Sequence, residues 1–121
     1  MIHGAHILLY STDPEADRAF FRDVLEFPAV DAGRGWLIFA LPPAEVAVHP
    51  ADGPVAGDLL KTELYLMCDD LRSTLAKLAD QGIAATGVEE LRWGIRTTIR
   101  LPSGGEIGLY QPTHETALGL R

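Results

Sequence analysis

The chain has 121 residues, 47% of them hydrophobic, and its 10 Lys and Arg against 17 Asp and Glu give a formal net charge of −7. This length suits one domain, and the apolar content is too high for a disordered chain. The acidic balance disfavours nucleic-acid partners, no apolar run approaches the roughly 18 residues of a membrane span, and the single Cys68 excludes an internal disulfide. Because the start lacks a signal-peptide pattern, we expect a cytoplasmic protein without membrane partners.

The first half of the sequence predicts a strand, a helix and two short strands. The apolar run at 5–11 predicts the first strand. Asp13 is a good helix N-cap because its side chain can accept a backbone N–H, and apolar residues at three- and four-residue steps give that helix one apolar face. Residues 36–41 and 46–49 predict two strands separated by a Pro-Pro break, and a further strand is expected near 28–31.

The second half predicts the same order of elements. Residues 63–68 predict a strand, and Asp70 is the N-cap of a helix whose leucines lie on one face. A hairpin is expected at 95–101 and 106–110 across a Gly-rich turn, with a further strand near 84–89. Each half is therefore predicted to be β-α-β-β with one extra strand.

Corresponding residues recur along the chain, which indicates an internal duplication. Three of the matches share a separation of 57 residues (63 − 6, 70 − 13 and 93 − 36), and the last has a separation of 61 (106 − 45). A slightly longer second connection explains the difference. The matched positions are His6 with Glu63, Asp13 with Asp70, Trp36 with Trp93, and the stretch 45–49 with 106–110.

The duplication predicts a single α+β domain over residues 1–121. We expect one repeat at 1–52 and a second at 61–112, joined by a linker at 53–60 and followed by a tail at 113–121. A sheet covered by its helix on one face leaves the other face open, so two such halves can pair around a concave cavity.

The opening of the chain resembles that of the vicinal oxygen chelate superfamily. The usual His, Asp, aromatic pair and DVLG segment are matched by His6, Asp13 and the run Phe20-Phe21-Arg22-Asp23-Val24-Leu25, with Glu26 in place of the Gly. This superfamily includes glyoxalase I, extradiol dioxygenases and bleomycin-binding proteins. The resemblance implies two tandem βαβββ modules that form a mixed sheet around a concave small-molecule site, in a homodimer.

The resemblance also implies a place for a divalent metal. Members that use a metal draw their ligands from four inward-facing strand positions, which map here to His6, Ala47, Glu63 and Gly108. His6 and Glu63 are therefore the candidate metal ligands. Ala47 and Gly108 have no side-chain donor, so the resemblance admits an Fe, Mn, Ni, Zn or Co ion and equally admits no metal.

Alternation along the strands predicts which side chains face the cavity, because residues two apart share a face of a strand. Glu106 is the candidate catalytic residue, as a third metal ligand or a general base. The arginines at 92, 96 and 100 are expected on the solvated surface, and one that points inward could instead pair with an anionic ligand. The candidate ligand-binding residues are Glu45, His49, Tyr65, Trp93 and Tyr110.

These residues leave two functions open, both with a small organic molecule as partner. In the first, the chain is a metal-dependent lyase, isomerase or dioxygenase of glyoxalase or extradiol type, whose metal holds two vicinal oxygens of the substrate. In the second, it is a metal-free drug- or metabolite-binding protein of bleomycin-resistance type, in which Glu45, Glu63 and Glu106 pair with a basic ligand. The missing donors at Ala47 and Gly108 favour the second, and whether the protein is an enzyme stays undecided.

Overall fold

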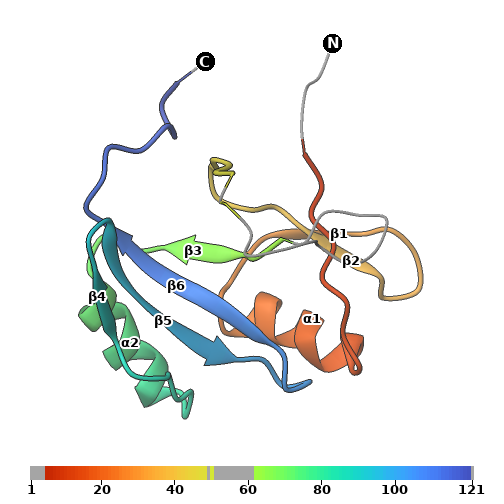
Figure 1. Cartoon of the computed structure of the whole chain (residues 1–121). Helices are drawn as coiled ribbons and strands as arrows, with labels where there is room; N and C mark the ends of the chain where they lie inside the picture. The colour runs from red at the N-terminus through yellow and green to blue at the C-terminus, as the bar shows by residue number, and fades with distance from the viewer. Residues whose placement is uncertain (1–4, 49, 51–61, 121) are drawn as a thin grey trace.

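The computed structural model describes residues 5–48, 50 and 62–120 of the chain (Figure 1). Within these residues it contains two helices, a two-stranded sheet in the first half and a four-stranded sheet in the second. This is the predicted α+β class. The elements in chain order are α1 (Pro14–Asp23), β1 (Ala29–Asp31), β2 (Leu37–Phe39), β3 (Tyr65–Met67), α2 (Leu71–Asp80), β4 (Glu89–Leu91), β5 (Gly94–Arg100) and β6 (Glu106–Pro112).

Side-chain caps start both helices where the sequence predicts them. Asp13 Oδ1 accepts the Ala16 N–H at 3.2 Å, and Asp70 Oδ1 accepts the Ser73 N–H at 3.1 Å. Each bond satisfies a backbone donor that has no partner inside its helix. The two helix predictions are confirmed. Among the described residues, neither helix has the length and hydropathy needed to cross a membrane.

The four-stranded sheet is mixed and has the order β3-β6-β5-β4. β3 and β6 run parallel, while β5 and β6 form an antiparallel hairpin from Gly94 opposite Pro112 to Arg100 opposite Glu106. The predicted hairpin is confirmed. The further strand expected near 84–89 begins only at the end of that range, as β4, and Ala85 makes an isolated bridge to Ile99.

The core lies between this sheet and the two helices. Leu71, Ile99 and Leu109 are exposed by no more than 2%, and burial of each such side chain contributes about 1.5–3 kcal/mol. Figure 1 shows α2 along one face of the sheet and α1 near the end where β5 turns into β6. The buried apolar members of the core are Phe20, Phe21, Leu71, Leu78, Ile99, Leu101, Ile107 and Leu109.

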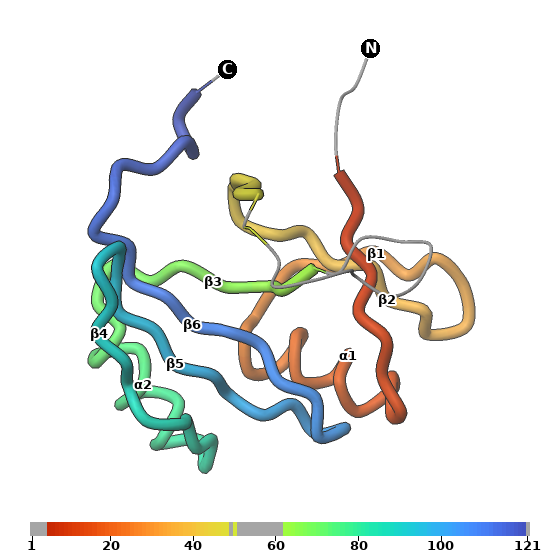
Figure 2. The backbone as a smooth tube through the Cα atoms, viewed as in Figure 1, coloured from red at the N-terminus to blue at the C-terminus, as the bar shows by residue number. Residues whose placement is uncertain are grey.

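The first half is less complete than the duplication predicts. Residues 5–11 and 46–48 are not in strands, although strands were expected at 5–11 and 46–49, and residue 49 and the linker 53–60 lie outside the described residues. In the second half, β6 lies between β3 and β5 and pairs with both. In the described part of the first half, the chain after β2 runs away from residues 5–11 (Figure 2), and β1 and β2 are the only strands that pair.

Candidate functional site

The face of the four-stranded sheet opposite α2 carries most of the predicted ligand-binding residues. Ile99 and Leu109 pack into the core on the α2 side. Because side chains alternate along a strand, Arg96 and Thr98 of β5 and Tyr110 of β6 lie on the other face. This is the face of the sheet that α2 does not cover.

Aromatic side chains gather around Tyr110. The ring centroid of Tyr110 lies 6.2 Å from that of Tyr65, 5.3 Å from Trp93 and 5.8 Å from His114. The Tyr110 hydroxyl donates to the Trp93 carbonyl oxygen at 2.8 Å, which fixes the ring. We call Tyr65, Trp93, Tyr110 and His114 the aromatic cluster. It joins three of the predicted ligand-binding residues and adds His114, which the sequence did not single out.

Gly108 explains why Tyr65 can reach this cluster. A Cβ atom on Gly108 would lie less than 3.0 Å from three ring atoms of Tyr65, which is closer than packed atoms approach. The missing side chain therefore makes room for the Tyr65 ring to lie across β6. The position that would supply a metal ligand in the superfamily pattern is covered by an aromatic ring.

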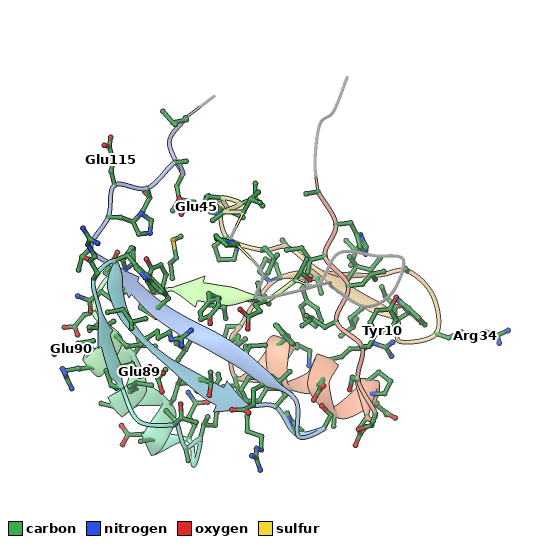
Figure 3. The ribbon with its side chains drawn as sticks, in the orientation of Figure 1. Tyr10, Arg34, Glu45, Glu89, Glu90 and Glu115 are labelled. Carbon is green, nitrogen blue, oxygen red and sulfur yellow. The ribbon has the colours of Figure 1, made fainter. Side chains whose placement is uncertain are left out.

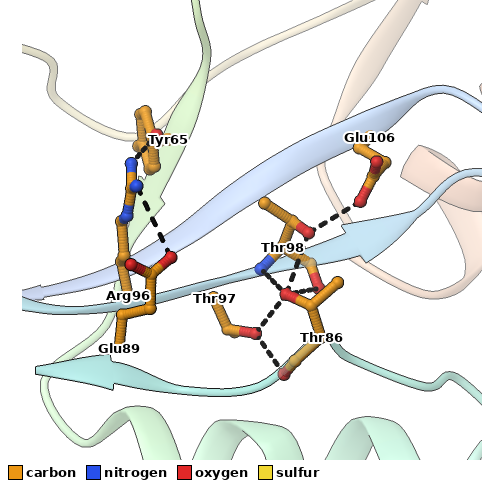
Figure 4. A network of polar contacts seen from close by, with 7 residues as sticks. All are labelled: Tyr65, Thr86, Glu89, Arg96, Thr97, Thr98 and Glu106. Carbon is orange, nitrogen blue, oxygen red and sulfur yellow. Dashed lines mark hydrogen bonds and ion pairs between the residues drawn. The ribbon is translucent and has the colours of Figure 1, made fainter.

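Arg96 supplies a positive charge beside the aromatic cluster. Its Nη1 donates to the Tyr65 hydroxyl at 2.8 Å, and its Nη2 lies 3.5 Å from Glu89 Oε1 (Figure 4). The side chain is 33% exposed, so Arg96 corresponds to the inward-pointing arginine that the sequence left open beside a solvated one. The reason is the hairpin register, which sets Arg96 opposite Tyr110.

Glu45 brings the first half of the chain to the same place. Its Oε1 accepts the Ala117 N–H at 2.7 Å, and its Oε2 lies 4.0 Å from His114 Nε2. Figure 3 shows Glu45 next to the C-terminal segment that carries Glu115. Burial, and secondly the Glu45 carboxylate, raise the pKa of the Tyr110 phenol. Glu45 therefore lies at the edge of the aromatic cluster, and its direct partners are in the C-terminal tail.

Glu106 lies apart from this group. Its Oε2 accepts the Thr98 hydroxyl at 2.7 Å, and Thr98 also contacts Thr86 (Figure 4). Four residues along β6 separate Glu106 from Tyr110, which corresponds to roughly 13 Å in a strand. Glu106 is thus part of a polar network at the far end of the sheet.

The residues present do not fit a divalent metal. Ala47 and Gly108 have no donor atom, and Tyr65 covers Gly108. No group of three or more His, Cys, Asp or Glu side chains in the described part of the chain is placed to hold an ion. His6 lines a cavity in the first half, Glu63 precedes β3, and His49 lies outside the described residues.

That cavity is distinct from the aromatic cluster. It has a volume of about 400 Å³ and lies between residues 5–9 and 36–41 above α1. Phe21 and Phe39 give it an apolar wall, and Arg18 lies 4.7 Å over the Trp36 ring at its edge. Of the described candidate ligand-binding residues, none lines it.

Comparisons with protein-family models and with curated proteins find no match for this chain. Solved structures do match it. TnmS3, an antibiotic-binding protein from Streptomyces sp. CB03234, is 27% identical with a TM-score of 0.62 over 93% of this chain and 100% of that chain. A glyoxalase/bleomycin resistance protein from the same strain is 28% identical with a TM-score of 0.56 over 84% and 93%. Lactoylglutathione lyase from Agrobacterium tumefaciens, at 19% identity and a TM-score of 0.65 over 90% and 92%, shares the fold.

These matches agree with the pattern at the start of the sequence. The two Streptomyces structures share more than a quarter of their residues with this chain across most of both lengths. The helix that carries Phe20 and Phe21 is present, and the order of elements in the second half is the one that the resemblance implies. The chain has the fold of glyoxalase and bleomycin-resistance proteins, and its likeness to the two Streptomyces structures puts it in the vicinal oxygen chelate superfamily.

Proposed function

We propose that this protein binds a flat aromatic small molecule at the aromatic cluster without using a metal. The observation that carries the proposal is the meeting of Tyr65, Trp93 and Tyr110 with the guanidinium of Arg96 on one face of the sheet. The antibiotic-binding activity in the name of TnmS3, which is 27% identical, supports a role of this kind.

The cluster already holds one flat ring in the position that a ligand would take. His114 stacks on Tyr110 with an interplanar angle of 25°, and Tyr110 is only 7% exposed. Stacked aromatic pairs contribute about 0.5–1.5 kcal/mol beyond the area that they bury. A ligand with a larger ring system therefore gains by replacing the imidazole on Tyr110, while the exposed Trp93 ring offers a second wall.

Arg96 defines the polar group of the ligand. A guanidinium has five N–H donors, and Tyr65 and Glu89 engage only some of them. The others can donate to a carboxylate or carbonyl oxygen at the edge of the ligand. Glu45 and Glu106, two of the carboxylates assigned to a basic ligand from the sequence, have partners within the chain instead.

The metal-dependent reading has less support. Two of the four superfamily positions lack donors, and Tyr65 occupies the space in front of Gly108. Binding through rings and an arginine needs none of these ligands. We therefore propose that the protein holds its ligand without a metal, and that sequestration rather than turnover is its role.

Fluorescence titration with three naphthalene probes tests this function. We expect 2-naphthoate to bind about tenfold more tightly than 2-naphthamide or 2-naphthylmethylammonium, because hydrogen bonds between charged groups contribute about 1.5–3 kcal/mol. Arg96→Gln should remove that preference. Arg72→Gln, on the exposed surface of α2, is the matched control and should keep it. If none of the probes binds, the proposed function is wrong.

We also propose that the protein acts as a homodimer. The first half exposes several large apolar side chains, including Leu8 at 60%, Val30 at 66% and Trp36 at 58%. Exposed apolar surface of this extent is typical of an association site. A second copy of the chain, which carries the same surface, is the proposed partner.

A further inference from the structure

His114 lies where a ligand of the aromatic cluster would lie, and its contacts describe that place. Its imidazole stacks on the Tyr110 ring, with the ring centroids 5.8 Å apart and an interplanar angle of 25°. Its Nδ1 lies 2.7 Å from the Glu115 carbonyl oxygen, and its Nε2 lies 4.0 Å from Glu45 Oε2. Both ring nitrogens therefore face oxygen atoms that accept hydrogen bonds and do not donate them.

These contacts suit a positively charged ring. A neutral imidazole has one N–H, so one of its two nitrogens would turn a lone pair toward an oxygen atom. An imidazolium has an N–H on each nitrogen, and it also brings a positive charge to the Glu45 carboxylate. The place over Tyr110 therefore matches a flat ring that carries a positive charge.

Glu45 supplies the negative charge of this place. Its side chain is only 18% exposed, and a carboxylate withdrawn from water in this way needs a cation or a hydrogen-bond donor close by. The Ala117 N–H donates to Oε1 at 2.7 Å, and Oε2 faces the ring on Tyr110. Burial, and secondly the Glu45 carboxylate, raise the pKa of the Tyr110 phenol, so the charge of Glu45 acts on this part of the cluster.

The Tyr110 ring itself also attracts a cation. The face of an aromatic ring carries partial negative charge, so a cation placed over it is stabilised. Arg18 makes such a contact in the same chain, 4.7 Å over the Trp36 ring. The bond from the Tyr110 hydroxyl to the Trp93 carbonyl oxygen fixes the ring that a ligand would meet.

Arg96 provides the opposite charge at a different member of the cluster. Its guanidinium contacts the Tyr65 hydroxyl, whereas Glu45 faces the ring stacked on Tyr110. The ring centroids of Tyr65 and Tyr110 are 6.2 Å apart, a separation that a molecule with two fused rings spans. One ligand can therefore meet both charges.

We infer that the position of the His114 imidazole is a subsite for a flat cationic ring, and that the ligand of the aromatic cluster is a zwitterion. Its positive ring replaces the imidazole beside Glu45, and its carboxylate binds Arg96. His114 is then an internal competitor of the ligand, while Ala117 keeps Glu45 in place. The carboxylate end rests on the proposed function, whereas the cationic subsite rests on the contacts of His114.

Fluorescence titrations with two probes of the same shape test the charge of the ring. 1-Methylquinolinium-6-carboxylate is a zwitterion, and 5-methyl-2-naphthoate lacks its positive charge. We expect the zwitterion to bind the wild type about fivefold more tightly, because it adds an ion pair and a cation–π contact. Glu45→Gln should abolish this difference. Glu115→Gln, which removes an exposed carboxylate from the same tail, is the matched control and should keep it.

Two results of these titrations would overturn the inference. One is equal affinity of the two probes for the wild type. The other is an equal loss in Glu45→Gln and Glu115→Gln, which would mean that the charge of the whole tail and not the Glu45 carboxylate attracts the ring. Binding of 5-methyl-2-naphthoate would in both cases still support the proposed function.

Substitution of His114 tests the competition. His114→Ala should strengthen the binding of both probes several-fold, because neither has to displace the imidazole. His114→Phe keeps a flat ring for Tyr110 and is the matched control, so its affinities should stay near those of the wild type. Unchanged affinities in His114→Ala would place the ligand elsewhere and overturn the inference.

A third probe, 1-methylquinolinium, separates this inference from the proposed function. It has no carboxylate, so its binding should depend on Glu45 and not on Arg96. If it binds and is weakened by Glu45→Gln while 5-methyl-2-naphthoate does not bind, the cationic subsite stands and anion binding at Arg96 is wrong. If 5-methyl-2-naphthoate binds and the positive charge brings no gain, the proposed function stands and the subsite is wrong. If none of the three probes binds, both are wrong.

Discussion

Single residues decide the character of the candidate site. Gly108 and Tyr65 share one volume across β3 and β6, because the ring takes the space that a side chain at 108 would need. Arg96 reaches the Tyr65 hydroxyl from the neighbouring strand and leaves donors for a ligand. At position 108, where the superfamily pattern would have a metal ligand, this chain has a glycine. The Tyr65 ring lies in the space that a side chain there would take, and it contacts Tyr110.

Gly108→Ala should disturb the aromatic cluster. The added Cβ would collide with the Tyr65 ring, and overpacking of this kind costs about 1–3 kcal/mol. We expect urea unfolding to show that loss, and 2-naphthoate to bind more weakly. Gly105→Ala is the matched control, since a Cβ there meets only Ser103 Oγ at 3.7 Å. Equal stability of the two variants would mean that Tyr65 does not lie across β6.

The titration of Tyr110 reports on Glu45. Burial and the Glu45 charge raise the pKa of the phenol above its ordinary value of 10.0, so the folded chain holds this proton more tightly than the unfolded chain. The resulting stability is complete below pH 10 and is lost as the pH rises through the folded-state pKa. Glu45→Gln should lower the pKa in an ultraviolet titration corrected with Tyr110→Phe. Glu63→Gln, at a carboxylate with no part in this shift, should leave it unchanged.

At the scale of elements, local signals predicted the helices and the hairpin, and they failed for two strands of the first half. The Asp13 and Asp70 caps act within one turn of the chain, so the sequence around them is sufficient. A strand needs partners, and the pairing of residues 5–11 depends on a segment about 40 residues away. Alternation at 5–11 shows what a strand would bury but does not place its neighbour.

Asp17 links the two halves between elements. It is 7% exposed, and its carboxylate accepts the Ser103 N–H at 3.0 Å and the Ser103 hydroxyl at 2.7 Å, which ties α1 to the turn of the β5–β6 hairpin. Asp17→Ala leaves a half-buried donor without a partner, so we expect a loss of about 1–3 kcal/mol in the free energy of unfolding. Asp23→Ala, at an exposed position of the same helix, should leave the unfolding curve in place. A similar loss in both variants would point to helix propensity instead of the link.

At the scale of the whole molecule, the two halves share a repeat but differ in how much apolar surface they cover. The second half encloses its core between a four-stranded sheet and α2. The first half leaves Val30 and Trp36 at the surface and contains a cavity of about 400 Å³. The exposed apolar side chains are therefore concentrated in the half that lacks a complete sheet.

Sedimentation velocity tests the proposed homodimer. We expect the wild type to sediment as a dimer at micromolar concentration. Trp36→Glu, which places a charge on the exposed apolar side of the first half, should weaken the dimer by more than tenfold. Leu120→Glu changes an apolar side chain in the tail that is more exposed than Trp36, and it should leave the dimer intact. A monomeric wild type would make the homodimer prediction wrong.

The sequence alone determined the features that depend on neighbours along the chain. It gave both helix starts, the β5–β6 hairpin, the face on which Tyr65 and Tyr110 lie, and the superfamily. The tertiary structure decided the rest, above all the contacts of Arg96 with Tyr65 and of Glu45 with the C-terminal tail. These contacts join residues that are 31 and 72 positions apart. The physical reason is that helix caps and strand alternation depend on residues a few positions apart. Contacts between residues far apart in the sequence depend instead on which segments the whole fold brings together.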